Sequence, residues 1–81
     1  MNKLLIHQIK KDKYRIGVNS LVFDWEIANF IGITEQKYNK ILYDNGAERD
    51  EYNRYSFYRR YDAERALEIL ESILILNKLN P

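Results

Sequence analysis

Hydrogen-bonding side chains gather in one short stretch of this chain, and they are the residues best suited to recognising a partner. Within residues 34–40 the chain carries a hydroxyl, a carboxylate, two amides and two ammonium groups, on Thr34, Glu35, Gln36, Lys37, Asn39 and Lys40. Groups of these kinds recognise a partner through hydrogen bonds and charge. The stretch therefore indicates a binding surface, provided that one structural element presents these groups together.

The remaining residues form no catalytic set. The chain has no phosphate-binding glycine loop, no serine or cysteine nucleophile beside a base, and no paired carboxylates outside solvated helix or turn positions. His7 is the only histidine, and a hydrogen-bonded ring on a strand is a simpler interpretation of it than a general base. The absence of cysteine excludes disulfides and thiolate metal sites. We expect no enzymatic activity, no metal and no cofactor.

The hydrogen-bonding stretch falls on the second of two short helices predicted between residues 24 and 43. Apolar residues recur at helical spacing on one face of each, Ile27, Ala28 and Ile31 in the first and Tyr38, Ile41 and Leu42 in the second. Gly32 is expected to form the turn, because glycine adopts a positive φ without steric cost. Asp24 and Thr34 stand at the expected N-cap positions.

This pair of segments resembles the helix-turn-helix of phage and bacterial DNA-binding proteins. That family has a small residue in the first helix and a glycine in the turn four residues later, and Ala28 and Gly32 stand at these positions. Apolar residues are expected around the pair and in the second helix, and here they are Ile27, Ile31, Ile33, Tyr38 and Ile41. The resemblance covers residues 24–43, and a plain helical hairpin without a ligand is the alternative.

The resemblance implies a role for the hydrogen-bonding stretch. In the family, residues just inside the start of the second helix read base edges in the major groove. The matching positions here are Thr34, Glu35, Gln36, Asn39 and Lys40, with Lys37 also facing outward. Gln36 or Asn39 would pair with adenine, Lys40 with guanine or a phosphate, and Glu35 with the amino group of cytosine. An ordinary solvated helix face is the alternative interpretation.

A β-hairpin is predicted directly after the second helix, with strands over residues 47–51 and 55–59 around a turn at 51–54. At this position a hairpin would be a wing. It would offer DNA the basic side chains of Arg49, Arg54, Arg59 and Arg60 together with Tyr52 and Tyr55. In the alternative interpretation the tyrosines pack on the core and the arginines offset the charges of Glu48, Asp50 and Glu51.

A long helix is predicted at the end of the chain, with Asp62 as its N-cap. The segment 58–64, followed by Ala66, Leu67 and Leu70, resembles the strand-to-helix close of excisionase-type and MerR-like winged-helix domains. In those domains this helix packs back on the helix-turn-helix. The residues expected to face the core form an inner stripe of Ala63, Ala66, Leu67, Leu70 and Leu74. Ile69, Ile73 and Leu76 fall outside this stripe, which predicts a homodimer or protein-docking interface.

The first nineteen residues contain two apolar segments, 4–9 and 14–18, around a lysine-rich connector. The alternation in the second segment predicts a hairpin, although Leu5 and Ile9 would also suit one turn of helix. Trp25, on the first turn of the helix that follows, is expected to be a core or rim residue covering one end of the domain.

Charge is unevenly distributed along the chain, although the net charge is only +1. Residues 1–22 carry +4, residues 23–53 carry −4, residues 54–61 carry +3 and residues 62–81 carry −2. The predicted helix-turn-helix is therefore acidic. This is unfavourable for a DNA-binding protein, because neutralisation of phosphates supplies much of the affinity.

Together these features predict an α+β fold in one domain, 1–81: a winged helix-turn-helix with an N-terminal β-hairpin (1–19), the helix-turn-helix (24–43), a wing hairpin (47–60) and a long C-terminal helix (62–79). We expect a DNA-binding phage or prophage-type regulator or recombination accessory protein, homodimeric, in the cytoplasm of a bacterial host and not in a membrane. A phage-encoded inhibitor that binds a host or defence protein is the main alternative, and a virion assembly component is a third.

Overall fold

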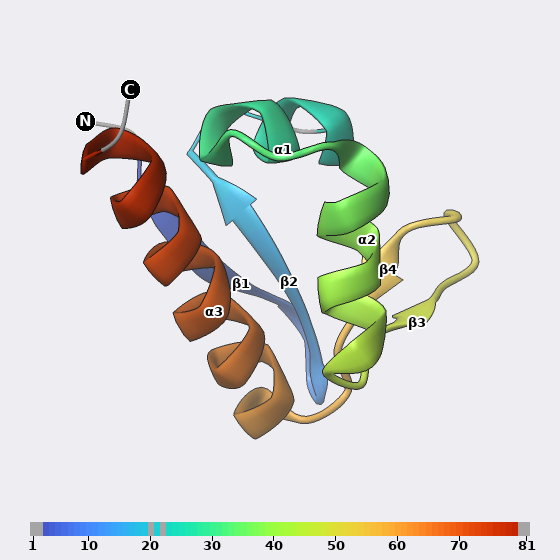
Figure 1. Cartoon of the computed structure of the whole chain (residues 1–81). Coiled ribbons are helices and arrows are strands. Elements are labelled where there is room, and N and C mark those ends of the chain that lie inside the picture. The colour runs from blue at the N-terminus through green and yellow to red at the C-terminus, as the bar shows by residue number, and fades with distance from the viewer. Residues whose placement is uncertain (1–2, 20, 22, 80–81) are drawn as a thin grey trace.

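Two β-hairpins and three helices follow one another in the computed structural model, which describes residues 3–19, 21 and 23–79 (Figure 1). The elements are β1 (Leu4–Lys10), β2 (Lys13–Val18), α1 (Asp24–Ile31), α2 (Glu35–Asp44), β3 (Glu48–Arg49), β4 (Tyr55–Ser56) and α3 (Arg60–Leu79). The protein is thus a small α+β domain with an N-terminal β-hairpin and three helices, which confirms the predicted fold class at this level.

The N-terminal hairpin pairs β1 and β2 in antiparallel register, with Leu4 opposite Val18 and Ile6 opposite Ile16. Successive side chains of a strand point to opposite faces, so Leu4, Ile16 and Val18 enter the core together. Leu5 and Ile9 lie on β1 and are exposed. The hairpin prediction is therefore confirmed, and the alternative of a helical turn is wrong.

The two helices α1 and α2 meet at Gly32, whose φ of 94° supplies the left-handed conformation predicted for the turn. The N–H of Gly32 donates to the carbonyl of Ala28 at 2.9 Å, and the N–H of Ile33 donates to the same carbonyl at 3.0 Å. Thr34 is the N-cap of α2, as predicted, and its hydroxyl accepts a 3.1 Å hydrogen bond from the N–H of Lys37. The predicted inner faces of both helices are buried, at Ile27, Ala28, Ile31, Tyr38 and Leu42.

The N-cap prediction for Asp24 is wrong, because α1 begins one residue earlier in its hydrogen bonding. Phe23 is the N-cap, and its carbonyl accepts from the N–H groups of Glu26 and Ile27, each at 3.1 Å. Asp24 is therefore the first residue inside the helix. There its carboxylate still lies where the positive end of the helix dipole favours an anion.

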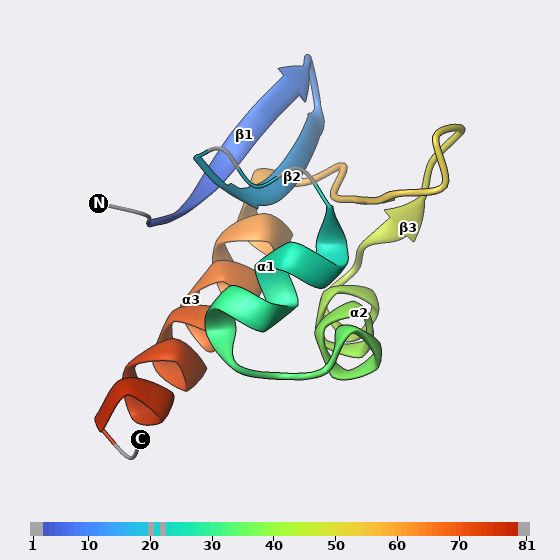
Figure 2. The same ribbon diagram turned by 90° about the horizontal axis from the view of Figure 1, so that it is seen from above.

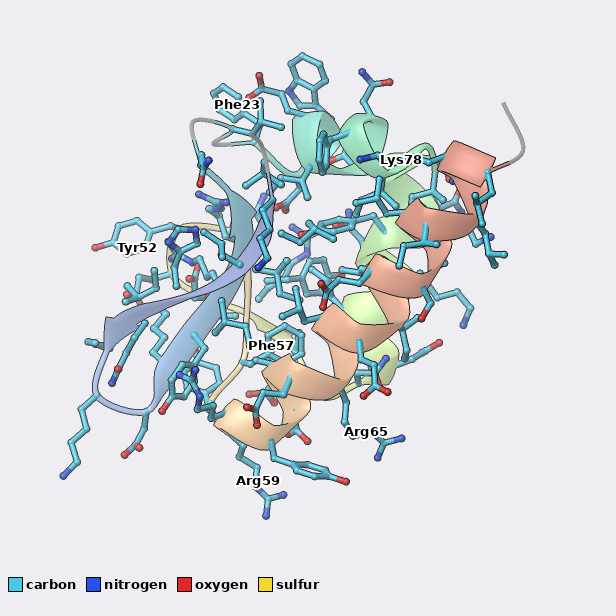
Figure 3. All side chains as sticks on the ribbon, turned by 90° about the vertical axis from the view of Figure 1, so that its left-hand side faces the viewer. Phe23, Tyr52, Phe57, Arg59, Arg65 and Lys78 are labelled. Carbon is cyan, nitrogen blue, oxygen red and sulfur yellow. The ribbon has the colours of Figure 1, made fainter. Side chains whose placement is uncertain are left out.

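The second hairpin is shorter than predicted, with only Glu48 opposite Ser56 and Arg49 opposite Tyr55. The chain leaves β4 at Phe57, which exchanges two hydrogen bonds of 2.7 Å with the backbone of Tyr14 on β2. Phe57 is fully buried there, between the strands and α3 (Figure 3). A contact with a strand more than forty residues away thus ends the hairpin, and the predicted extension of the strand to residue 59 is wrong.

The last helix, α3, begins at Arg60, two residues before the predicted start. Asp62 lies in its first turn and not at the N-cap, and the N–H of Asp62 bonds to the carbonyl of Arg59. Ala63, Ala66 and Leu70 are fully buried, as the predicted inner stripe requires. None of the helices within the described residues is both long and apolar enough to cross a membrane.

Helix α3 runs beside the N-terminal hairpin and reaches α1 with its C-terminal end (Figures 1 and 2). The side-chain amide of Asn77 donates to the carbonyl of Ile31 at 2.8 Å and to that of Gly32 at 3.3 Å. These bonds satisfy two carbonyls at the end of α1 and attach the turn to α3. The turn that leads into α2 is therefore attached to the C-terminal end of α3.

Candidate recognition surface

An open groove lies between α2 and the second hairpin. Gln36, Asn39, Lys40 and Tyr43 line it from α2, and Arg49 and Tyr55 line it from β3 and β4. Figure 2 shows this hairpin extending away from the body of the molecule beside α2. Three of the six polar residues predicted on the second helix therefore share one surface with a predicted arginine of the hairpin.

The two cations of the groove are held only by exposed contacts. Lys40 Nζ lies 3.0 Å from the carboxylate of Asp44, with both side chains more than half exposed. Such pairs contribute little to stability, so Lys40 can exchange Asp44 for another anion. Arg49 donates to the carbonyl and side-chain oxygens of Asn53 at 3.1 and 2.8 Å, and its guanidinium lies 4.7 Å from the ring centre of Tyr55.

Asn39 lines the groove from α2 and is partly buried. Its side-chain oxygen is buried and has no hydrogen-bond partner among the described residues. Buried polar atoms usually have a partner, because an unmade hydrogen bond costs free energy. In this conformation the oxygen of Asn39 is shielded from the groove, and the exposed amide at this surface is that of Gln36.

The other residues predicted on this face of α2 lie outside the groove. The hydroxyl oxygen of Thr34 caps the helix, so one of its acceptor sites is already occupied. Lys37 is exposed on the first turn, and Glu35 lines a different pocket near the start of α1. The structure thus divides the predicted stretch between two surfaces.

Only one of the four predicted wing arginines reaches the groove. Arg54 pairs with Asp24 at 3.7 Å, on the side of the hairpin that faces α1. Arg60 is the first residue of α3, where it lies 3.8 Å from Glu64 and near the ring of Tyr14. Arg59 projects into solvent at the amino end of the same helix (Figure 3). Placing Arg59 and Arg60 on the wing was wrong, because the hairpin ends before them.

The shape of the second hairpin depends on Asp50, whose side chain is wholly enclosed. Its carboxylate accepts hydrogen bonds from the N–H groups of Tyr52 and Arg54, at 2.9 and 3.1 Å, and from the Ser56 hydroxyl at 2.9 Å. Lys13 and Arg15 of β2 pair with the same carboxylate. Asp50 thereby fixes the turn and attaches it to the N-terminal hairpin.

Both charges of the Lys13–Asp50 pair are held in their ionised forms. Burial by itself raises the pKa of the Asp50 carboxyl, but hydrogen bonds from Arg15, the Arg54 backbone, Lys13 and Ser56 outweigh burial and hold this pKa well below its usual range. Burial by itself lowers the pKa of Lys13, and the hydrogen bond and charge of Asp50 raise it above 10.5. The sequence interpretation missed this cluster, since it paired Asp50 with the hairpin's own arginines.

Tyr38 is fully buried beneath α2, and its hydroxyl has no hydrogen-bond partner among the described residues. Burial raises its pKa above the ordinary value, and the negative charge of Asp24 adds to the rise. Burial also raises the pKa of Asp24, and the positive charge of Arg54 partly opposes this rise. The hydroxyl therefore stays neutral at ordinary pH.

The outer face of α3 carries exposed apolar side chains, namely Ile69, Ile75, Leu76 and Leu79. Ile73, predicted to belong to this face, is partly buried and packs against the core instead. Its placement outside the core was therefore wrong, because Ile73 follows the buried Leu70 by three residues and lies on the same face of α3.

Any proposal about the function of this protein depends on the surfaces described above, because similarity to known proteins gives no guide. No family model, curated protein or solved structure matches the chain. Within the described residues, no three histidine, aspartate or glutamate side chains gather as a metal site would require.

Proposed function

We propose that this protein binds double-stranded DNA through the groove between α2 and the second hairpin, as a winged helix-turn-helix regulator or recombination accessory protein. The observation that supports the proposal is the lining of the groove. Gln36, Asn39 and Lys40, chosen from sequence alone as base-reading residues, lie beside Arg49 of the hairpin.

In the proposed complex α2 enters the major groove. The exposed amide of Gln36 offers the paired donor and acceptor that adenine requires, and Lys40 reaches guanine or a phosphate. The amide of Asn39 would have to rotate to expose its buried oxygen before it could pair with adenine. Arg49, on the hairpin, contacts the adjacent backbone and fixes the register of α2 along the duplex. Tyr43 and Tyr55 supply apolar contact area and hydroxyl groups at the edges of the groove.

The electrostatics of the groove limit the proposed affinity. Lys40 and Arg49 are its only two cations among the described lining residues, and Glu48 and Asp44 are near them in the sequence. Each neutralised phosphate contributes about −0.9 to the slope of log affinity against log salt concentration. With two cations, one protomer is therefore expected to have a shallow salt dependence, with a slope of roughly −2.

A homodimer would compensate for the modest contacts of one protomer. The exposed apolar side chains of α3 offer a surface that two copies could share across a two-fold axis. Such a dimer would place two α2 helices on half-sites one DNA turn apart, roughly 34 Å. Its preferred site would then be a palindrome.

The test is binding of the purified full chain to random-sequence duplex DNA at two salt concentrations, followed by sequence selection on the bound fraction. Micromolar or tighter binding with the shallow slope above, and enrichment of a palindrome, supports the proposal. No binding at low salt contradicts it. Binding of single-stranded and duplex DNA with equal affinity also contradicts it, because α2 would then not be reading a major groove.

A further inference from the structure

A second pocket opens where the first residues of α1 and α2 meet the turn of the second hairpin. The residues that matter in it are Phe23, Asp24 and Trp25 at the start of α1, Glu35 at the start of α2, and Tyr52 and Arg54 on the hairpin. It shares no lining residue with the groove of Gln36 and Lys40. The two surfaces are therefore separate.

Three aromatic side chains stand at this pocket with most of their surface in solvent. Phe23, Trp25 and Tyr52 are 59%, 56% and 70% exposed. The rings of Phe23 and Trp25 stack, with centres 6.4 Å apart and planes inclined by 11°. Figure 3 shows Phe23 and Tyr52 at the outside of the molecule. Gathered exposed aromatic residues are typical of protein interfaces, where tryptophan and tyrosine dominate binding energy.

The charges at the pocket favour a cationic occupant. Arg54 lies 3.7 Å from Asp24, so the only cation among these residues is already paired. Glu35 is exposed and forms no ion pair with any described residue. The pocket therefore combines aromatic faces, which attract cations, with a carboxylate free to accept a hydrogen bond.

We propose that this pocket binds an arginine-bearing segment of a basic partner protein, with the guanidinium stacked on Tyr52, near Trp25, and hydrogen-bonded to Glu35. Arginine suits the site better than lysine, because its planar guanidinium both stacks on a ring and pairs with a carboxylate. Nucleic acid suits the site less well. Its bases could stack on the rings, but Glu35 would repel the phosphates that supply most of its affinity.

The test uses the full chain and a hexa-arginine peptide, with Trp25 fluorescence as the readout. Trp25 is the only tryptophan, so its emission reports on this pocket alone. We expect a saturable change with hexa-arginine, a weaker one with hexa-lysine and none with hexa-glutamate. Unchanged Trp25 emission at saturating hexa-arginine overturns the proposal.

Two variants keep the fluorophore and test the contacts. Glu35→Gln and Tyr52→Ala are each expected to weaken hexa-arginine binding at least about fivefold, since each removes one of the two interactions. The matched controls are Glu68→Gln and Tyr61→Ala, which alter an exposed carboxylate and an exposed tyrosine on α3. Both controls should bind as the parent chain does. Equal weakening by Glu68→Gln would show general attraction to acidic surface and overturn the proposal.

Nucleic acid is the competing occupant of the pocket. Titration with a single-stranded thymidine oligonucleotide distinguishes nucleic-acid binding from binding of an arginine-bearing segment. A saturable Trp25 change with single-stranded oligo-dT that strengthens in Glu35→Gln would assign the pocket to nucleic acid and overturn the proposal. The proposal stands apart from duplex DNA binding. Lys40→Ala weakens duplex binding in the proposed function and should leave hexa-arginine binding unchanged.

Discussion

The ammonium nitrogen of Lys13 lies 3.1 Å from the carboxylate of Asp50, and both side chains are almost completely enclosed. Lys13 belongs to the N-terminal hairpin and Asp50 to the second hairpin, so the pair joins two elements that are distant in the sequence. The hairpin that lines the candidate DNA groove thus depends on residues outside that groove. A variant at Asp50 would change the groove without touching any of its lining residues.

Replacing Asp50 with asparagine should destabilise the fold strongly. The substitution keeps the shape of the side chain but removes the counter-charge of Arg15 and leaves Lys13 with only the exposed carboxylate of Glu51, at 3.6 Å. Breaking an enclosed ion pair is costly. We expect the melting temperature, measured at neutral pH by circular dichroism, to fall by more than about 10 °C. A shift of less than a few degrees would mean that water screens the pair.

The same pair predicts how stability depends on pH. The folded-state pKa of Asp50 lies below its ordinary value of 3.8, so its contribution is complete above that value and is lost as pH falls below it. The difference in unfolding free energy between the parent chain and Asp50→Asn should therefore narrow between about pH 5 and pH 2. Denaturant titrations across that range measure it. A constant difference would show that Asp50 acts through packing and not through its charge.

Replacing Tyr38 with phenylalanine should stabilise the protein. Its hydroxyl is buried and unpaired among the described residues, and removing an unsatisfied polar group recovers about 1 kcal/mol of unfolding free energy. Denaturant unfolding should show a raised midpoint with an unchanged slope. A loss of stability would show that the hydroxyl has a hydrogen-bond partner in solution.

Lys40→Ala should weaken duplex binding and reduce the salt slope by about one unit, because it removes one phosphate or guanine contact. Arg59→Ala is the matched control. It also removes an exposed cation, but Arg59 lies at the amino end of α3 and outside the groove. Electrophoretic mobility shifts at two salt concentrations compare them. Equal losses in the two variants would mean that binding follows total charge and not the groove.

Gln36→Ala should relax sequence preference more than it lowers overall affinity. An amide that pairs with adenine contributes about 1 to 3 kcal/mol of discrimination at one base pair and little to non-specific binding. Sequence selection with the variant should lose information at one position of each half-site. Uniform weakening at every position would assign Gln36 to the phosphate backbone.

Ile69 and Ile73 lie one turn apart on α3 but are buried to different extents, so they should respond differently to aspartate. Ile69→Asp introduces a charge on the exposed face and should convert a dimer to a monomer without lowering the melting temperature. Ile73→Asp introduces a charge against the core and should lower the melting temperature instead. Light scattering with size-exclusion chromatography gives the mass. A parent chain that is monomeric at high concentration would rule out the dimer through α3.

The sequence by itself determined those features that depend on neighbours within about one helical turn. The positive φ at Gly32, the cap formed by Thr34 and the inner faces of α1 and α2 were all predicted, because each follows from spacing of four residues or fewer. The alternation in Tyr14–Val18 likewise predicted the N-terminal hairpin. The resulting set of Gln36, Asn39 and Lys40 on one face of a helix needed no tertiary information.

Only the tertiary structure decided which distant groups meet. Arg15 bonds to Ser56 across 41 positions and to Asp50 across 35, and the pairing of Phe57 with Tyr14 ended a strand that local alternation alone would have continued. Arg54 faces α1, Arg60 begins α3 and Ile73 packs inward for the same reason. An ion pair or a strand end is chosen by whichever partners packing brings within reach. The linear spacing of residues does not contain that information.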